Sequence, residues 1–135
     1  GQEGYDSDKF IEIAGAAAEG TLVTTSLNRD SDSPVTQSFL TEYRKAVGAG
    51  ADMVAASSFT ATNVLIEGLK KTGGKGGEAL RAAMAGGTFT TPIGKLTFNT
   101  LNEVAKDIQV QVVKGKAFRQ HSVISDPVLL APPTK

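Results

Sequence analysis

The spacing of apolar residues predicts a short helix near the start of the chain. Ser7 is a favourable N-cap, and Asp8 follows in the first turn, where the helix dipole favours an acid. Small and apolar residues then recur at helical spacing until Gly20: Phe10, Ile13, Ala14 and Ala17. The β-branched segment TLVTTS, residues 21–26, predicts a brief strand after this helix.

The next 60 residues predict three helices. Ser33 and Pro34 are typical N-cap and N1 residues, and the GAG segment at 48–50 ends the helix that they begin. A longer helix is predicted from about Met53 to Lys71, and EALRAAMAGG, residues 78–87, forms a short third one. The faces expected to be buried are Val35, Phe39, Leu40, Tyr43 and Val47 on the first, and Ala55, Phe59, Thr62, Ile66 and Leu69 on the second.

In the last third of the chain, the spacing of the apolar residues changes from that of helices to that of strands. IGKLTF at 93–98 predicts one strand, and IQVQVVKGKAF at 108–118 predicts two strands joined by a turn at KGK. In the second segment, Ile108, Val110 and Val112 alternate with glutamines, which is typical of a half-buried strand. Residues 121–135 contain three prolines and are expected to form a surface tail. One early strand cannot complete a sheet, so exposed strand edges favour a homodimer or an exchanged assembly.

Composition excludes several classes of function. Lys plus Arg number 14 and Asp plus Glu number 14, so no basic field is present to hold a nucleic acid. There is no cysteine, which excludes thiolate metal sites, a thiol nucleophile and disulfides. No apolar run is long enough to span a membrane, and no signal peptide is visible. Because the first residue is Gly, we expect a chain whose natural start lies upstream.

Most of the polar motifs favour ordinary structural roles. His121 is the only histidine, so we expect no metal site, no catalytic triad and no cofactor. GGKGGE at 73–78 lacks the Ser or Thr of a phosphate loop, and the acids of residues 28–33 lack the spacing of a calcium loop. The four hydroxyls of SSFTATN, residues 57–63, could line a polar pocket or lie at helix-packing positions.

Glu3 and Tyr5 are the remaining candidates for a binding site. Glu3 stands between Gln2 and Gly4, and a carboxylate close to glycine can be presented to a cation while an aromatic ring shields it. The alternative is that Glu3 is simply a solvated acid near a chain end.

Longer stretches of the sequence resemble a known family. The blocks are the acid at position 3, IAGAAAEG at 13–20, the proline-started helix, the small-residue helix and TPIGKLTF at 91–98. Their order resembles the C-terminal part of the periplasmic branched-chain amino-acid binding proteins, the type I solute receptors of ABC importers. The resemblance covers about residues 1–120.

The resemblance implies an α/β fold with two lobes, which close over a solute by a hinge motion. The chain would be a C-terminal fragment of it, with three helices plus a few strands drawn from both lobes. Residues 1–32 would belong to the second lobe, 33–86 to the first lobe, 87–120 to the closing strands of the second lobe, and 121–135 to a tail.

The resemblance also implies a site. Glu3 matches the acid that binds the α-ammonium of the ligand, Tyr5 matches an aromatic at the cleft edge, and Val54 matches a position that touches the ligand side chain. Relatives commonly carry an aromatic residue at this last position, so Val54 is a departure that puts a strict leucine, isoleucine or valine preference in doubt. The residues that bind the ligand carboxylate would lie upstream of this chain.

The function implied is that of a substrate-binding component of an ABC importer for amino acids or related small carboxylates. It would work in the periplasm with an ABC permease and would not be an enzyme. Two alternatives stay open at this point. One is a sensory or regulatory module of the same fold, and the other is a small stand-alone α/β enzyme.

Overall fold

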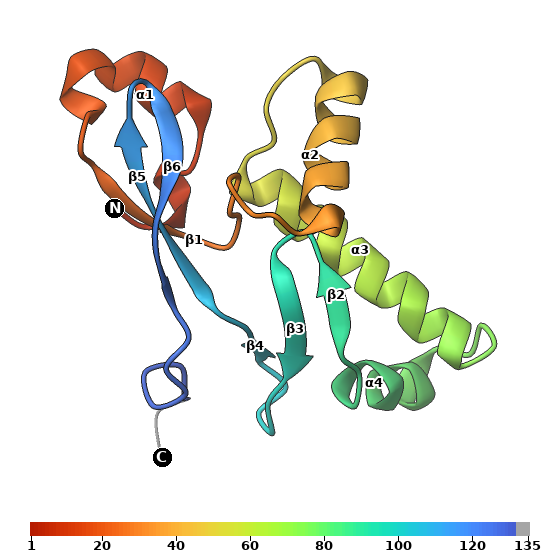
Figure 1. The fold of residues 1–135 in the computed structure, drawn as a ribbon. Helices are drawn as coiled ribbons and strands as arrows, with labels where there is room; N and C mark the ends of the chain where they lie inside the picture. The colour runs from red at the N-terminus through yellow and green to blue at the C-terminus, as the bar shows by residue number, and fades with distance from the viewer. Residues whose placement is uncertain (132–135) are drawn as a thin grey trace.

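The computed structural model describes residues 1–131, in which helices and strands follow in the predicted order (Figure 1). The first part contains η1 (Glu3–Tyr5), α1 (Asp8–Ala14), η2 (Gly15–Ala18) and β1 (Leu22–Thr25). Three helices follow: α2 (Pro34–Val47), α3 (Met53–Lys71) and α4 (Gly77–Ala85). The last part contains β2 (Phe89–Thr91), β3 (Gly94–Phe98), β4 (Val104–Ala105), β5 (Ile108–Lys114) and β6 (Ala117–Ile124).

The first helix begins as predicted but ends early. The Ser7 side chain accepts a hydrogen bond from the backbone N–H of Lys9 at 3.2 Å, which confirms the N-cap. Gly15 then ends α1 with φ of 56° and ψ of −129°, a conformation open mainly to glycine, and the 3₁₀ turn η2 continues to Ala18. Because of this break the buried residues are Ile11 and Ala18, whereas Ile13 is 84% exposed. The predicted face was therefore wrong at Ile13 and at Ala17, which is also exposed.

The predicted ends of α2 are confirmed, and so is about half of the face that was predicted to be buried. Pro34 is the first helical residue, and Gly48 caps the helix with φ of 78° while its N–H donates to the carbonyl of Arg44. Phe39 is buried, and Leu40 and Tyr43 pack around the same core. The predicted members at the two ends of the face, Val35 and Val47, are exposed.

Helix α3 spans Met53–Lys71 as predicted, but it buries a different face. Asp52 accepts a hydrogen bond from the backbone N–H of Ala55 at 2.8 Å and caps the helix. The buried residues are small or polar rather than large: Ala56, Thr60, Val64 and Gly68. Gly68 lies against Leu80 and Met84 of α4, and the absence of a Cβ lets the two helices approach closely.

The six strands form two antiparallel three-stranded sheets, in the orders β1-β5-β6 and β2-β3-β4. The predicted turn at KGK is confirmed, since Lys114 pairs with Ala117 and both turn residues, Gly115 and Lys116, have left-handed φ angles. The short strands β2 and β4 were not predicted. Strand β6 continues to Ile124, so the predicted tail at 121–135 begins with regular structure, and its residues 132–135 lie outside the described part.

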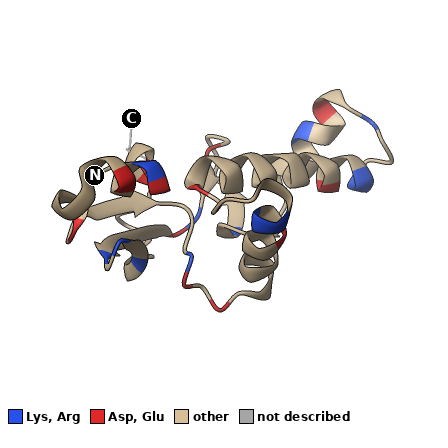
Figure 2. Ribbon diagram, turned by 90° about the horizontal axis from the view of Figure 1, so that it is seen from above, with Lys and Arg blue, Asp and Glu red and all other residues tan. Residues whose placement is uncertain are grey.

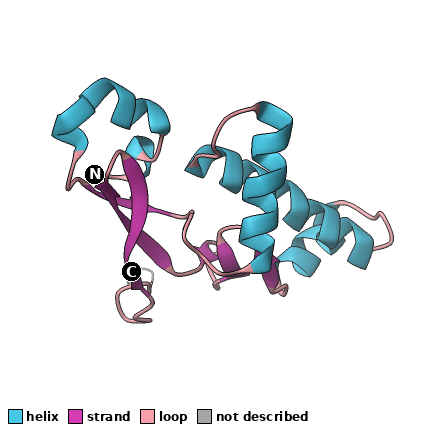
Figure 3. Cartoon of the chain, turned by 45° about the horizontal axis from the view of Figure 1, so that its top comes forward, coloured by secondary structure: helices cyan, strands magenta, loops and turns pink. Residues whose placement is uncertain are grey.

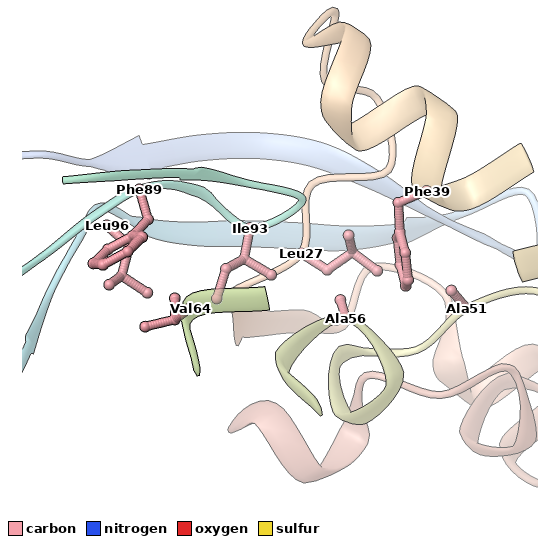
Figure 4. Packing of buried hydrophobic residues seen from close by; sticks show 8 residues of the cluster. All are labelled: Leu27, Phe39, Ala51, Ala56, Val64, Phe89, Ile93 and Leu96. Atoms are coloured by element: carbon pink, nitrogen blue, oxygen red, sulfur yellow. The ribbon is translucent and has the colours of Figure 1, made fainter. Parts of the chain in front are cut away.

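Two separate hydrophobic clusters hold the fold. The first packs β2 and β3 against α2 and α3 (Figure 4) and consists of Leu27, Phe39, Ala51, Ala56, Val64, Phe89, Ile93 and Leu96. The second packs the first helix and η2 on the β1-β5-β6 sheet and consists of Ile11, Ala18, Val23, Val113 and Phe118. Residues 87–98 were expected to group with the second-lobe strands, whereas β2 and β3 share the core of the helices.

The chain crosses between these two clusters twice. It leaves β1 through residues 26–33 to reach α2, and it returns through residues 99–107 to enter β5 (Figure 1). Helices α2, α3 and α4 lie together on one side of these crossings, and α1 lies with the other sheet (Figure 3). Acidic and basic residues are interspersed over both parts (Figure 2). Among residues 1–131, no helix has both the length and the apolar character that crossing a membrane requires.

Candidate functional site

Glu3 lies beside the first crossing between the two clusters. The hydroxyl of Ser26, the residue that follows β1, donates a hydrogen bond of 2.7 Å to Glu3 Oε1. Ser26 is buried, whereas Glu3 is exposed. The turn η1 is further held against β1 because the N–H of Thr24 donates to the carbonyl of Gly1 at 3.0 Å. The carboxylate of Glu3 is therefore oriented by a buried hydroxyl while it stays open to solvent.

Tyr5 shares the η1 turn with Glu3. Its ring packs edge-on against Phe10 with 5.2 Å between the ring centroids, and Tyr5 is 47% exposed. Val54 lies on a different element, in the first turn of α3, and is 61% exposed. The structure thus brings Glu3 and Tyr5 together on one turn. The contact of Val54 with a ligand stays a prediction.

Lys106 is a charged residue near Glu3 that sequence reasoning did not single out. It follows β4 in the second crossing and is half-buried. Burial lowers the pKa of its ammonium, whereas the nearby carboxylates of Glu3 and Asp107 raise that pKa. The charge of Glu3 therefore favours the charged form of Lys106, although no ion pair joins the two side chains within residues 1–131.

A buried ion pair, Asp6 with Arg29, lies next to this site. The side chain of Asp6 is fully buried, and its Oδ1 lies 2.6 Å from Arg29 Nη1. The hydroxyl of Thr25 donates a hydrogen bond to the same carboxylate. Burial raises the pKa of Asp6 above its ordinary value, and Asp52 adds to this effect, although Arg29 and Thr25 act in the opposite direction.

Arg29 extends the network to both hydrophobic clusters. Its Nη1 donates to Gln111 Oε1 at 2.9 Å, and its Nη2 donates to the carbonyl of Ala51 at 3.0 Å. The guanidinium also lies 5.1 Å from the ring centroid of Phe118. Gln111 in turn donates to the carbonyl of Leu27 at 2.8 Å. Ala51 and Leu27 belong to the helical cluster and Phe118 to the other one, so these bonds join the two parts of the chain.

The structure shows what two polar motifs of the sequence contact, the acids of residues 28–33 and the hydroxyls of residues 57–63. Asp30, from the acidic segment, accepts from Arg119 Nη1 at 3.0 Å and from the N–H of Gln120 at 2.8 Å, so this carboxylate anchors β6. Of the hydroxyls at 57–63, Ser57 and Thr60 line a pocket whose other walls are mainly apolar. Within residues 1–131, no group of three or more Asp, Glu or His side chains is arranged to hold a metal ion.

Comparisons with known proteins agree on one kind of protein. The family described as "Periplasmic binding protein" matches residues 3–117. The leucine-, isoleucine-, valine-, threonine-, and alanine-binding protein of Pseudomonas aeruginosa is 27% identical over 99 residues, which make up 73% of this chain and 26% of that protein.

Solved structures give the same result for the fold. A leucine binding protein from Thermotoga maritima has a TM-score of 0.82 and 24% identity, covering 94% of this chain and 37% of that one. A solute binding protein of an ABC transporter from R. palustris, in complex with benzoate, has a TM-score of 0.73 and 23% identity, covering 83% and 32%. The chain therefore has the α/β fold of part of a two-lobe solute-binding protein and spans 26–37% of the length of these relatives.

Proposed function

Because the chain belongs to the periplasmic binding protein family, we propose that it is part of the substrate-binding component of an ABC importer for amino acids or related small carboxylates. The names of the relatives support this proposal. One is a binding protein for five amino acids, and another was solved with benzoate. In this role the protein works in the periplasm, delivers its ligand to an ABC permease and catalyses no reaction.

We further propose that the two hydrophobic clusters belong to two lobes. The cluster around Phe39 and Val64 would lie in one lobe, and the cluster around Val23 and Val113 in the other. The lobe boundary that we propose differs from the one expected from the sequence. Residues 87–98 are assigned to the lobe of the helices, because Phe89, Ile93 and Leu96 pack in the same cluster as α2 and α3. The two crossings at 26–33 and 99–107 would be connections of the hinge. The comparisons lend no support to a homodimer, and the proposal does not include one.

The observation that carries the proposal is the position of Glu3 at the crossing between the clusters. Its carboxylate is oriented by the Ser26 hydroxyl and exposed on its other side, which suits it to bind an ammonium group by charge-assisted hydrogen bonds. Tyr5 on the same turn would form the edge of the cleft, and Val54 would contact the ligand side chain when the lobes close. Closure would bury the charge of Glu3, which then requires a partner on the ligand.

The experiment is a ligand screen on the full-length protein. A solute that binds only the folded state raises the midpoint of thermal unfolding, and the rise grows with the logarithm of its concentration relative to its Kd. We expect such a rise with at least one L-amino acid or small carboxylate. If the unfolding midpoint is unchanged by amino acids, carboxylates and sugars alike, the role of a solute receptor is contradicted.

A further inference from the structure

The guanidinium of Arg29 is bound more strongly to one part of the chain than to the other. Toward the β1-β5-β6 sheet, its Nη1 lies 2.6 Å from the buried carboxylate of Asp6 and donates to Gln111 Oε1 at 2.9 Å. Toward the helices, the one hydrogen bond that this group makes within residues 1–131 runs from Nη2 to the carbonyl of Ala51 at 3.0 Å. Arg29 therefore belongs with the sheet, and its bond to Ala51 reaches across to the helices.

The two kinds of contact differ in the cost of breaking them. Separating Arg29 from Asp6 would leave a fully buried carboxylate without its counter-ion, which is strongly unfavourable. Breaking the bond to Ala51 keeps that ion pair intact, and the Arg29 side chain, which is partly exposed, can then bond to water. A movement of the helices relative to the sheet is therefore expected to break the Ala51 bond and to leave the ion pair in place.

The groups that Arg29 joins lie next to the two halves of the candidate site. Asp6 directly follows η1, the turn that carries Glu3. Ala51 lies just before α3, and Val54 is in the first turn of that helix. The bond between Arg29 and Ala51 therefore holds the segment of Val54 in a fixed position relative to the segment of Glu3.

The sheet part and the helical part also approach each other at Gly50, beside Ala51. A Cβ at position 50 would lie 3.0 Å from Asp8 Oδ2 and 3.6 Å from Arg44 Nη2. Asp8 is the first residue of α1 and Arg44 is in the last turn of α2, and these two helices lie on either side of the first crossing (Figure 3). A side chain at position 50 would crowd both groups. The glycine thus permits the close approach at which Arg29 reaches Ala51.

We propose that Arg29 is a latch between the two lobes. Its bond to the carbonyl of Ala51 stabilises the arrangement of the lobes described above and breaks when the lobes change their angle. The inference rests on the proposed function, because it requires that the two clusters belong to lobes that move. Arg29 is a positioning residue in this role, since it acts on Glu3 and Val54 through the segments that carry them. A bond present in only one arrangement shifts the ratio of the two populations toward that arrangement.

The test measures the distance between the lobes in the full-length protein without ligand. Lys9 on α1 and Lys45 on α2 are exposed and lie in different parts of the chain. Lys9→Cys and Lys45→Cys, in a background without other cysteines, can therefore carry two spin labels. Pulsed electron paramagnetic resonance then gives the distribution of distances between the labels.

Arg29→Lys in this labelled protein removes the latch while keeping a charge for the ion pair. A lysine retains the cation beside Asp6 but lacks the planar fork that also reaches Ala51. We expect the population at the main wild-type distance to fall about two- to tenfold relative to all other distances, which is the scale of one hydrogen bond. A lower unfolding midpoint with an unchanged distribution would mean that Arg29 is purely structural and would overturn the latch.

Arg119→Lys is the matched control for this substitution. Arg119 also bonds to the first crossing, through Asp30, but it lies on β6, so its bond stays within the sheet part of the chain. The distances in Arg119→Lys should equal those of the wild type. A shift as large as that of Arg29→Lys would overturn the latch, because any loosening of the crossing would then have the same effect.

Gln37→Met is a second variant that leaves the ion pair untouched and decides the matter if Arg29→Lys does not fold. Gln37 is exposed on α2, and its Nε2 donates to the carbonyls of Arg29 at 3.2 Å and Ser31 at 2.6 Å. These bonds hold the backbone of Arg29 near the helices, where its side chain reaches Ala51. The main distance should lose population about twofold or more in Gln37→Met.

The outcomes separate this inference from the proposed function. Equal distance distributions in the wild type and in each folded variant, Arg29→Lys or Gln37→Met, would overturn the latch and leave the importer role intact, because the measurement needs no solute. Failure of every solute in the ligand screen would contradict the importer role, whatever the distances show.

Discussion

Asp6 Oδ1 lies 2.6 Å from Arg29 Nη1 at the point where the chain passes from the β1-β5-β6 sheet toward α2. The side chain of Asp6 is fully buried, and that of Arg29 is 18% exposed. The guanidinium also bonds to Gln111 and to the carbonyl of Ala51, so one side chain contacts both hydrophobic clusters. This network holds the first crossing in place. It lies close to Glu3, because Thr25 bonds to Asp6 and the next residue, Ser26, bonds to Glu3.

Replacing Arg29 by Met should destabilise the protein strongly. The change leaves the buried carboxylate of Asp6 without its counter-ion, which costs about 3–5 kcal/mol in comparable cases. Arg119→Met is the matched control, because the Arg119 side chain is 58% exposed and the N–H of Gln120 still donates to Asp30 in its absence, so the change should cost about 0–1 kcal/mol. Urea unfolding of the two variants measures the difference. Equal losses would mean that the buried pair contributes no more than a surface pair.

The titration of Asp6 should give the stability a definite pH dependence. Because burial raises the pKa of Asp6 in the folded protein above 3.8, the folded state binds more protons than the unfolded state between these two pKa values. The contribution of Asp6 is thus fully present below the unfolded pKa and is lost as pH rises through the folded pKa. The free energy of unfolding of the wild type minus that of Asp6→Asn should fall with rising pH in this window. A difference that rises with pH would contradict the direction of the shift.

The two glutamines of β5 should respond oppositely to the same substitution. Gln111→Met leaves the carbonyl of Leu27 without its donor and removes one acceptor of the Arg29 guanidinium, so it should cost about 1–3 kcal/mol. The Oε1 atom of Gln109 is buried and has no hydrogen-bond partner in the described part of the chain. Gln109→Met should therefore be neutral or stabilising. Chemical denaturation of both variants tests this, and a larger loss for Gln109→Met would refute the network.

Gly87 should be intolerant of a side chain because of Phe89. A Cβ at position 87 would lie 2.4 Å from the Phe89 ring, which is buried in the helical cluster. Gly87→Ala should cost about 1–3 kcal/mol, the usual range for overpacking a core. At Gly86 a Cβ meets only the carbonyl of Ala82 at 3.5 Å, so Gly86→Ala serves as the control. Equal thermal stability of the two variants would mean that the Phe89 ring can move aside.

Local sequence signals predicted where the elements begin and end. Pro34 and the GAG segment marked the ends of α2, and the KGK segment marked the turn between β5 and β6. These signals depend on backbone conformation and on groups within a few residues, which a sequence displays directly.

The buried faces and the charged network could not be predicted in the same way. On α3 the larger residues Phe59 and Ile66 are 46% and 43% exposed, because close packing against α4 selects the side with Thr60 and Gly68. On β5 the most buried residues are Gln111 and Val113 instead of the expected Ile108, Val110 and Val112, since Gln111 is bound by Arg29. Periodicity identifies an apolar stripe but not the partner that covers it.

The candidate site residues Glu3, Tyr5 and Val54 came from family resemblance, and their contact with a ligand stays a prediction. Glu3 and Tyr5 lie on one turn as expected, but the hydrogen bond from Ser26 joins residues 23 positions apart. Lys106 lies in the second crossing, residues 99–107, for which the sequence predicted no role. Its place near Ser26 follows from the antiparallel pairing of β1 with β5, in which Thr25 lies opposite Gln109. Neither composition nor spacing indicates such a tertiary arrangement.

The central claim is that Glu3 binds the ammonium of an amino-acid ligand, and calorimetric titration of the Glu3→Gln variant of the full-length protein tests it most directly. The substitution keeps the size of the side chain and removes its charge. Glu12→Gln is the control, because Glu12 forms an exposed pair with Lys9 on α1. The account predicts that Glu3→Gln weakens binding of the amino acid by about tenfold or more while Glu12→Gln does not. Equal affinity of Glu3→Gln and the wild type would contradict it.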